Sequence, residues 1–282
     1  MTLNKKLIAL LLMGGVGLAG CGSDDHDEGA EHAASAGSHA GSMKASHASG
    51  AKAGGHGAAH WTYAGEGGPH MWGELSDEFA TCGTGKSQSP IDISPVTITE
   101  LPPIEVDYKS TVLDVTNNGH TIKVSYAPGS SITVGGKKYD LLQFHFHSPS
   151  EHTVGGKSFA MVAHLVHKAA DGQLGVIGVL MEEGASNFLV QKVWKNMPKE
   201  EGGHKTVEKV KLNVAQLLPK DMSYYNYSGS LTTPPCSEGV NWMVLRNPVT
   251  VSAAQVQQFT ELFPLSVRPV QPLNGRVVKT SN

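Results

Sequence analysis

His145 and His147 are the residues whose type and spacing most directly indicate chemistry. They belong to the segment Gln143-Phe144-His145-Phe146-His147. Successive side chains of a β-strand point to opposite faces, so both imidazoles and Gln143 share one face. Zinc favours neutral imidazole nitrogen, and a catalytic zinc site takes three protein ligands and an open fourth position. The pair therefore offers two of the three ligands. The alternative is two histidines on a half-exposed strand face that bind no metal.

A third ligand has four candidates in the same part of the chain: His120, His152, His164 and His167. Residues 159–167 have the composition of a strand, and the two histidines in it are an odd number of positions apart. They must therefore face opposite sides, and only one of them can join the first pair. Periodicity does not choose between these two.

The elements that position these histidines are expected to be mainly strands. Helical patterns are limited to apolar spacing over 187–194 and a capping box at Ser252 that opens a helix to about Phe263. Strands outnumber helices and do not alternate with them. This predicts an α+β fold, a single domain around a large, mainly antiparallel twisted sheet with a few peripheral helices. The clearest predicted strands, each bounded by Gly, Pro, Asn or Asp, are 112–116, 121–126, 139–147, 159–167 and 174–181.

The N-terminus has the pattern of an export signal. Two lysines precede an apolar run that ends in small residues before Cys21, and the run is too short to span a membrane. Residues 18–21 resemble the lipobox of bacterial lipoproteins, which implies cleavage after residue 20 and acylation of Cys21. Gly22 then implies sorting to the outer membrane. The alternative is an ordinary cleaved signal with a stray cysteine.

Residues 21–58 are expected to form a flexible tether. They are rich in Gly, Ala, Ser and His and lack the aromatic and β-branched residues that a core requires. The five histidines in this stretch are irregularly spaced and fit no preformed site, so a plain spacer is preferred to weak capture of zinc or copper. The predicted organisation is therefore a signal peptide over 1–20, a tether over 21–58 and one domain over 59–282.

Three cysteines would leave an odd thiol in an oxidising compartment. Lipidation of Cys21 removes that problem and leaves Cys82 and Cys236 to pair, which export permits. A loop of this length would constrain the unfolded chain by on the order of 4–5 kcal/mol in the entropy model. The net charge of −3 gives no basic field for nucleic acid, so no nucleic-acid partner is expected.

Eight short motifs occur in a fixed order along the chain, at residues 61–63, 85–91, 117–120, 143–147, 150–153, 163–167, 230–235 and 268–273. Together and in this order they resemble the α-class carbonic anhydrases, over nearly all of residues 60–276. The cysteine pair and the short loop before Glu151 resemble the bacterial branch. The resemblance implies the fold of that family and a Zn²⁺ held by His145, His147 and His164, with Gln143 in support. It also implies reversible hydration of carbon dioxide to bicarbonate and a proton, by attack of zinc-bound hydroxide.

The resemblance also assigns roles around the metal. Thr232 would donate its single hydroxyl proton to a buried Glu151 carboxylate and so accept from the nucleophile. Without this role, Thr232 is a turn residue and Glu151 a surface carboxylate. Thr233 would lie at the substrate mouth. The apolar wall for carbon dioxide would comprise Val166, Val176, Leu231, Val240 and Trp242.

His120 matches the proton-shuttle position of the family, and an ordinary pKa of about 6.5 suits a group that loads and unloads near neutral pH. The alternative is a surface histidine in a turn. Tyr63 and Asn118 resemble residues that order the connecting waters. Lys123 departs from the neutral polar residue that animal members often have. If it faces the cavity, its charge would depress the pKa of His120.

Val162 is a second departure. The family usually has a glutamate two residues before the third histidine, and its carboxylate accepts a hydrogen bond from the free ring nitrogen of that histidine. Valine cannot accept one, so weaker zinc retention is expected.

The leading hypothesis is a lipid-anchored carbonic anhydrase of the cell envelope, in the periplasm or at the cell surface. Carbon dioxide and bicarbonate would be its substrates, and sulfonamides or anions its inhibitors. The alternative is a non-catalytic metal-holding or adhesive envelope lipoprotein, which the histidines of the tether would best support. The presence of all three expected ligands with Glu151 and Thr232 favours the enzyme.

Overall fold

The computed structural model describes residues 60–281. The predicted signal peptide, the lipidation site Cys21 and the tether lie outside these residues and stay predictions. Within residues 60–281, no helix is long and apolar enough to cross a membrane.

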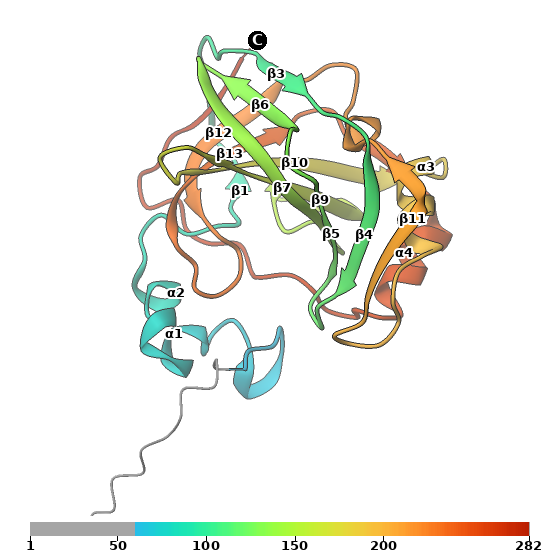
Figure 1. Ribbon diagram of the computed structural model, residues 1–282. Coiled ribbons are helices and arrows are strands. Elements are labelled where there is room, and N and C mark those ends of the chain that lie inside the picture. The colour runs from blue at the N-terminus through green and yellow to red at the C-terminus, as the bar shows by residue number, and fades with distance from the viewer. Residues whose placement is uncertain (1–59, 282) are drawn as a thin grey trace, which may run out of the picture. The chain divides into compact units, whose positions relative to one another are not determined.

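One large sheet dominates the described domain (Figure 1). Its 13 strands are β2 (Val96–Ile98), β3 (Ile104–Asp107), β4 (Thr111–Asn117), β5 (Ile122–Ser125), β6 (Ser131–Val134), β7 (Lys137–His147), β9 (Met161–Ala169), β10 (Leu174–Glu183), β11 (His204–Leu212), β12 (Tyr224–Ser230), β13 (Glu238–Leu245), β14 (Val249–Val251) and β15 (Val278–Thr280). A separate parallel pair joins β1 (Asp92–Ile93) to β8 (Thr153–Val154).

The path through the large sheet runs β11-β4-β5-β7-β9-β10-β13-β12-β15-β2, with β3, β6 and β14 attached beside it. Three of its pairings are parallel: β10 with β13, β10 with β14, and β15 with β2. The remaining pairings are antiparallel, so the prediction of a mainly antiparallel sheet is confirmed. All five predicted strands are present, as β4, β5, β7, β9 and β10.

Helices are short and peripheral, as predicted. Asn187 caps α3 by accepting from the backbone N–H groups of Leu189 and Val190. The capping box at Ser252 opens α4 as expected, but α4 ends at Thr260 rather than near Phe263. The proline at 264 disfavours the helical conformation of the residue before it, which explains the earlier end. The helices are α1 (Trp72–Leu75), α2 (Thr81–Thr84), α3 (Phe188–Trp194), α4 (Ala253–Thr260) and the 3₁₀ turns η1 (Gly65–Gly67), η2 (Asp77–Phe79) and η3 (Val214–Leu217).

The two faces of β7 and β9 have different chemistry. Phe144 and Phe146 are fully buried in the larger hydrophobic core, which α3 and α4 also cover. The intervening histidines of β7 take the opposite face. A second, smaller apolar cluster lies on that side and includes Val166, Val176 and Trp242. The strand pair therefore separates a dry core from a polar site.

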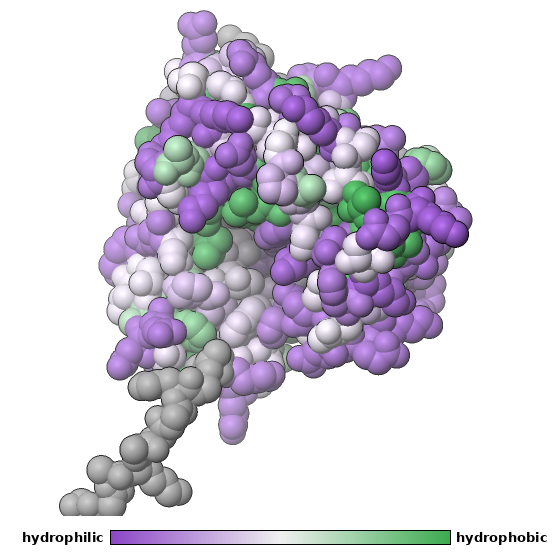
Figure 2. Space-filling model, viewed as in Figure 1, coloured by the Kyte–Doolittle hydropathy of each residue, from purple (hydrophilic) through white to green (hydrophobic). Residues whose placement is uncertain are grey.

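Few large hydrophobic side chains of the described domain are exposed, and the face drawn in Figure 2 is mainly hydrophilic, with small hydrophobic groups. The exposed ones are Val96, Ile98, Val106, Leu142, Phe188, Leu265, Val270 and Val277.

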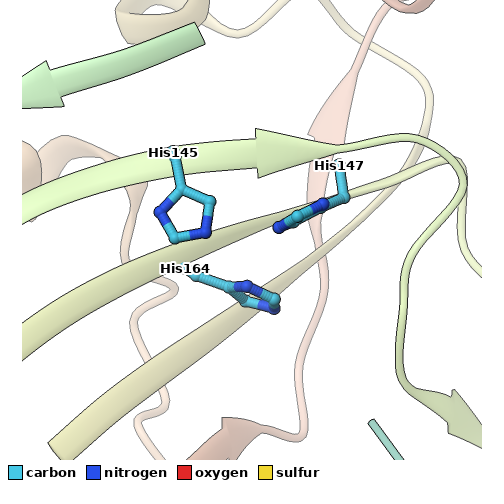
Figure 3. Close-up of side chains that lie close together, drawn as sticks. All are labelled: His145, His147 and His164. Atoms are coloured by element: carbon cyan, nitrogen blue, oxygen red, sulfur yellow. The ribbon is translucent and has the colours of Figure 1, made fainter. Parts of the chain in front are cut away.

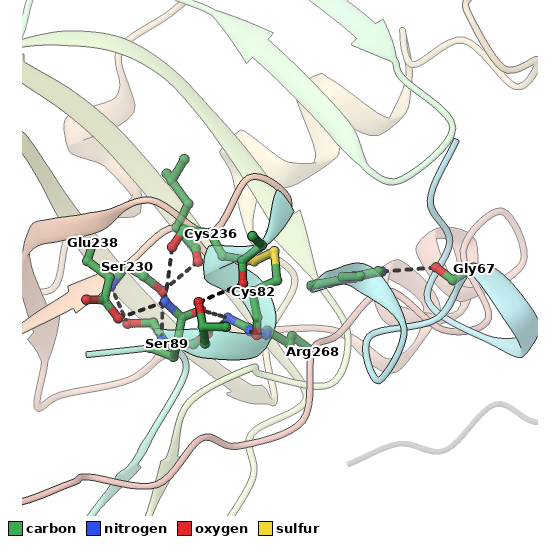
Figure 4. The surroundings of a disulfide bond; sticks show 12 residues. Gly67, Cys82, Ser89, Ser230, Cys236, Glu238 and Arg268 are labelled. Atoms are coloured by element: carbon green, nitrogen blue, oxygen red, sulfur yellow. Dashed lines mark hydrogen bonds between the residues drawn. A yellow bond between two sulfur atoms is a disulfide. The ribbon is translucent and has the colours of Figure 1, made fainter. Parts of the chain in front are cut away.

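A disulfide joins Cys82 of α2 to Cys236, which follows β12, and so confirms the predicted pairing (Figure 4). The backbone N–H of Cys236 donates to the Thr233 carbonyl at 2.8 Å, so the bond holds the loop that carries Thr232 and Thr233. Arg268 supports the same region. Its buried guanidinium donates to the Cys82 carbonyl at 3.0 Å and to the Ser89 carbonyl at 2.8 Å.

Loss of this disulfide should destabilise the domain. Replacing both cysteines with serine (Cys82→Ser with Cys236→Ser) should lower the free energy of unfolding by about 2–5 kcal/mol, because the unfolded chain loses a long-range constraint. Thermal unfolding with and without dithiothreitol measures this. The reductant should lower the melting temperature of the wild-type protein and leave that of the double variant unchanged. Equal sensitivity of the two proteins would contradict the role given to the bond.

Candidate metal centre and active-site cavity

Three imidazoles converge on one point between β7 and β9 (Figure 3). His145 and His147 come from β7 and His164 from β9, and the antiparallel register places His145 directly opposite His164. One ring nitrogen of each histidine lies within 4.8 Å of those of the other two. Within residues 60–281 this is the only such cluster of potential metal ligands.

Hydrogen bonds decide which nitrogen of the β7 histidines faces the common point. The Nδ1 of His145 donates to the Gln143 side-chain carbonyl at 2.9 Å, and the Nδ1 of His147 donates to the Ser266 backbone carbonyl at 2.6 Å. Carbonyl oxygens only accept, so each Nδ1 carries the proton. The Nε2 of each ring is left with a free lone pair.

His164 turns the other nitrogen toward the site. Its Nδ1 lies 3.8 Å from Oε2 of Glu151, and the Nε2 of His147 lies 3.6 Å from the same oxygen. The two nitrogens therefore approach one another beside this carboxylate. The donor set is two Nε2 atoms and one Nδ1, which fits the three-histidine sites in which zinc keeps one open position.

Burial keeps two of these imidazoles neutral. It lowers the pKa of His145 and of His164 well below the usual value of 6.5, and the neighbouring histidines lower both further. A neutral imidazole offers a lone pair, so both rings are ready to bind a cation at neutral pH.

Glu151 is a buried carboxylate next to this cluster. Burial raises its pKa, while His147, the backbone N–H of Arg268 and the side chain of Thr232 oppose the rise. The Arg268 N–H donates to Oε1 at 2.9 Å. The Thr232 hydroxyl lies beside the carboxylate, whose buried Oε2 has no well-aligned donor among the described residues. The two side chains expected to form a hydrogen bond therefore lie next to one another.

The predicted apolar wall is one cluster of side chains. Val176 of β10 lies between Val166 of β9 and Trp242 of β13 in the sheet register. Val240 is buried in the same cluster and Leu231 packs against it. Because His164 also lies on β9, and its ring is 4.9 Å from that of Trp242, this cluster forms a wall beside the three imidazoles.

A cavity of about 140 Å³ opens in front of the histidines, and we call it the inner cavity. Thr233 lines it, as predicted for the substrate mouth. The other residues that line it and bear on function are Tyr63, Asn118, His120, Lys123, Gln143, His145 and His147.

Comparison with known proteins decides the family. The family model for eukaryotic-type carbonic anhydrases matches residues 67–282. A carbonic anhydrase from Klebsiella pneumoniae is 48% identical over 225 residues, covering 78% of this chain and 91% of that protein. The chain belongs to the α-class carbonic anhydrase family.

Solved structures agree with this assignment. A hyperthermostable carbonic anhydrase from an active hydrothermal vent chimney is 50% identical with a TM-score of 0.77, over 79% of this chain and all of that one. The α-carbonic anhydrase of Thermovibrio ammonificans, solved with the inhibitor sulfanilamide, is 46% identical with a TM-score of 0.77, over 79% of this chain and 100% of that one.

The residues expected on the proton path of the carbonic anhydrase lie together at the cavity. His120 stacks on Trp61, with ring centroids 3.7 Å apart and planes 10° apart. Asn118 does more than line the cavity: its Oδ1 accepts from the backbone N–H groups of His120 and Thr121 at 3.0 and 2.9 Å. It therefore fixes the turn that carries His120. This turn is an Asx turn, which was not predicted from the sequence.

Lys123 faces the inner cavity, but the effect expected for it is not observed. The pKa of His120 is lowered mainly by burial and further by His60, and Lys123 is not among the causes. Its charge acts instead on His145, the residue opposite it in the sheet register, and lowers that pKa.

His152 and His167, two of the other candidates for the third ligand, have other partners. The Nε2 of His167 lies 2.7 Å from the hydroxyl of Tyr108, on the face of β9 away from the site. The Nε2 of His152 lies 2.6 Å from the hydroxyl of Tyr227. Both are buried, so both serve the packing of the domain. The structure thus makes the choice that periodicity left open, in favour of His164.

Ser266 and Arg268 are functional neighbours that the analysis of the sequence did not identify as such. The Ser266 backbone carbonyl accepts a hydrogen bond from His147, and the Arg268 backbone N–H donates one to Glu151. Both contacts are made by backbone atoms from more than 100 positions away in the chain, at separations of 119 and 117 residues. Backbone groups are present at every residue, so no residue type marks these positions.

Val162 leaves the third histidine without the acceptor that the family usually supplies. Val162 is fully buried, lies two residues before His164 on the same strand face, and pairs with His147 across β7 and β9. The Nε2 of His164 is buried and has no hydrogen-bond partner among the described residues. The Nδ1 of His152 is likewise buried without a partner, and the two rings lie 6.1 Å apart. A carboxylate at position 162 would therefore face at least one unpaired imidazole nitrogen.

The ligand assignment predicts a loss of metal in His164→Ala. The purified variant should contain almost no zinc, because two imidazoles bind this ion far more weakly than three. His120→Ala removes a nearby cavity histidine that is not a ligand, so it should retain one zinc per chain. Metal analysis after dialysis makes the comparison. Full zinc content and activity in the His164→Ala protein would show that another residue is the third ligand.

Val162→Glu should slow the release of zinc to a chelator. Hydrogen-bond partners of metal-bound histidines typically change metal affinity by about 10–100-fold. Val162→Gln offers an amide oxygen without a charge and should have an intermediate effect, while Val162→Leu should match the wild-type protein. The rate of zinc transfer to a coloured chelator is the measurement. If neither the glutamate nor the glutamine slows release, another acceptor already orients His164.

Proposed function

We propose that this protein catalyses the reversible hydration of carbon dioxide to bicarbonate and a proton, with zinc held by His145, His147 and His164. The observation that carries the proposal is the convergence of three imidazole nitrogens at the junction of an apolar wall and a buried carboxylate. Zinc at this point would supply Lewis acidity that lowers the pKa of water and so provides a nucleophile near neutral pH.

The number of hydrogen-bond donors shows how Thr232 and Glu151 would orient the reacting groups. A hydroxyl has one proton to donate. When Thr232 donates it to the Glu151 carboxylate, its oxygen can only accept from a group in the cavity. The backbone N–H of Arg268 holds the other oxygen of that carboxylate at 2.9 Å, which keeps the acceptor in place.

The apolar wall would hold the substrate. Carbon dioxide has no net charge or dipole and gains little from hydrogen bonds. An apolar surface therefore suits it, because no tightly bound water has to be displaced from such a surface. Val166, Val176 and Trp242 provide that surface next to His164. Thr233 lines the inner cavity, past which bicarbonate would leave.

His120 would remove the proton that each hydration releases. It lines the inner cavity, and its pKa is lowered from 6.5 mainly by burial. An imidazole with such a pKa is mostly neutral at pH 7, and is therefore able to accept a proton from the cavity and release it to buffer.

The test is rapid-mixing measurement of carbon dioxide hydration by the zinc-loaded protein. Hydration should be fast, should disappear after metal removal and should return with added zinc. A primary aryl sulfonamide should inhibit, as the sulfanilamide complex of the Thermovibrio relative suggests. A zinc-loaded protein without hydration activity would instead support a non-catalytic metal-holding or adhesive lipoprotein.

The cellular location of the protein is proposed from its N-terminal sequence. A lipid at Cys21 would anchor the domain in the cell envelope, and the Cys82–Cys236 disulfide is compatible with an exported protein. Labelling with a fatty-acid analogue, lost in Cys21→Ser, tests the anchor.

The shuttle role predicts a selective defect in His120→Ala. Turnover (kcat) should fall by about 10-fold or more in weak buffer, because proton release then limits the rate, and imidazole should largely restore it. The ratio kcat/KM for carbon dioxide should hardly change, since it does not include proton release. Stopped-flow assays over a series of buffer concentrations provide both values. Equal losses in kcat and kcat/KM would exclude this role.

A further inference from the structure

A second cavity adjoins the inner cavity, and His120 lies between the two. It has a volume of about 350 Å³, and we call it the outer cavity. His120 and Tyr63 line both cavities, while Glu201 and His60 line only the outer one. His120 is therefore part of the wall between the two cavities. The histidine cluster lies on one side of this wall, and the titratable groups of Glu201 and His60 lie on the other.

Backbone hydrogen bonds fix the loop of Glu201 to the strand end that carries His120. The N–H of Asn117 donates to the Gly203 carbonyl at 2.9 Å, and the N–H of Gly202 donates to the Asn117 carbonyl at 2.8 Å. The Asn117 side chain, which is buried, also donates to the Lys199 carbonyl at 3.1 Å. The loop around Glu201 is thus tied to a residue three positions before His120.

The Glu201 carboxylate lies against Gly119, the residue just before His120. A Cβ atom added to Gly119 would come within 2.5 Å of Oε1 of Glu201. Gly119 has a φ of +84°, which favours glycine. The carboxylate therefore occupies space that a side chain at position 119 would fill, and it can approach the turn closely.

The charged groups around His120 act in opposite directions. Burial lowers its pKa, Glu201 raises it, and His60 lowers it. Lys123 lies on the inner side of the wall. The negative charge of Glu201 thus favours the protonated imidazole from the side of the outer cavity.

We propose that the outer cavity is the proton exit of this enzyme and that Glu201 is the residue that positions and stabilises the proton on His120 as it leaves. The inference rests on the proposed function. His120 would take a proton on one ring nitrogen from the inner cavity and release a proton from the other nitrogen to water or buffer in the outer cavity. No proton is gained or lost overall. The stack on Trp61 holds the plane of the ring during the transfer.

Glu201→Gln tests the inference, with Glu200→Gln as the matched control. Glu200 is the adjacent exposed carboxylate and does not line either cavity. The pKa of the His120 imidazole, followed by NMR in the zinc-loaded protein, should fall by about half a unit in Glu201→Gln, as expected for a partly exposed charge pair. It should stay unchanged in Glu200→Gln, and Glu201→Asp should restore most of the shift.

Exchange of ¹⁸O between carbon dioxide and water at equilibrium distinguishes failure of the proposed hydration activity from failure of the proton-exit proposal. The interconversion of carbon dioxide and bicarbonate should be the same in all variants. The release of labelled water, which depends on proton transfer through His120, should fall by roughly threefold in Glu201→Gln, matching the half-unit change in pKa. Absence of interconversion in the wild-type protein would refute the proposed function itself. Normal interconversion with unchanged water release and unchanged His120 pKa in Glu201→Gln would overturn the exit proposal alone, as would an equal loss of both rates.

Discussion

The pairing register of β7 and β9 is the constraint on which the site depends. It places His145 opposite His164 and Phe144 opposite Leu165, so one register fixes both the metal cluster and the dry core behind it. A slip by one residue would move every side chain of a strand to the other face. The fully buried Phe144 and Phe146 oppose such a slip, because it would expose their rings. Hydrophobic packing on one face therefore holds the histidines on the other.

Hydrogen bonds between buried polar groups from distant parts of the chain also position the site. Glu151, His147 and the segment 266–268 are joined by backbone donors and acceptors rather than by side-chain pairs. Arg268 extends the same network to Cys82 and thus to the disulfide that holds the Thr232 loop. Polar groups this far from water need partners, so the network holds each loop in one place. His147 and Glu151 are thereby held in fixed orientations by the protein itself.

Two residues of the site, Val162 and Lys123, differ from those that the family resemblance leads one to expect. With valine at position 162, a buried nitrogen of His164 has no hydrogen-bond partner within residues 60–281, at the contact that would orient a ligand. Lys123 adds a positive charge to the inner cavity, where it acts on His145 rather than on His120. On the far side of His120, Glu201 contributes a negative charge. The shuttle candidate is thus placed between cavities of different electrostatic character.

Sequence patterns predict five strands of the sheet, β4, β5, β7, β9 and β10, and the alternation that puts His145 and His147 on one face. These follow from local periodicity, which acts within a few residues. The pairing of Cys82 with Cys236 is predicted instead from the count of cysteines, once Cys21 is taken as the lipidation site. The family resemblance favours His164 over His167, but periodicity alone could not choose between them, because both lie on one strand and only the neighbouring strand defines which face is the site. Nor could it identify Ser266, the backbone of Arg268 or Glu201, whose contacts depend on loops brought together by folding. Such contacts are set by tertiary packing, since a backbone carbonyl or an exposed carboxylate has no distinctive mark in the chain.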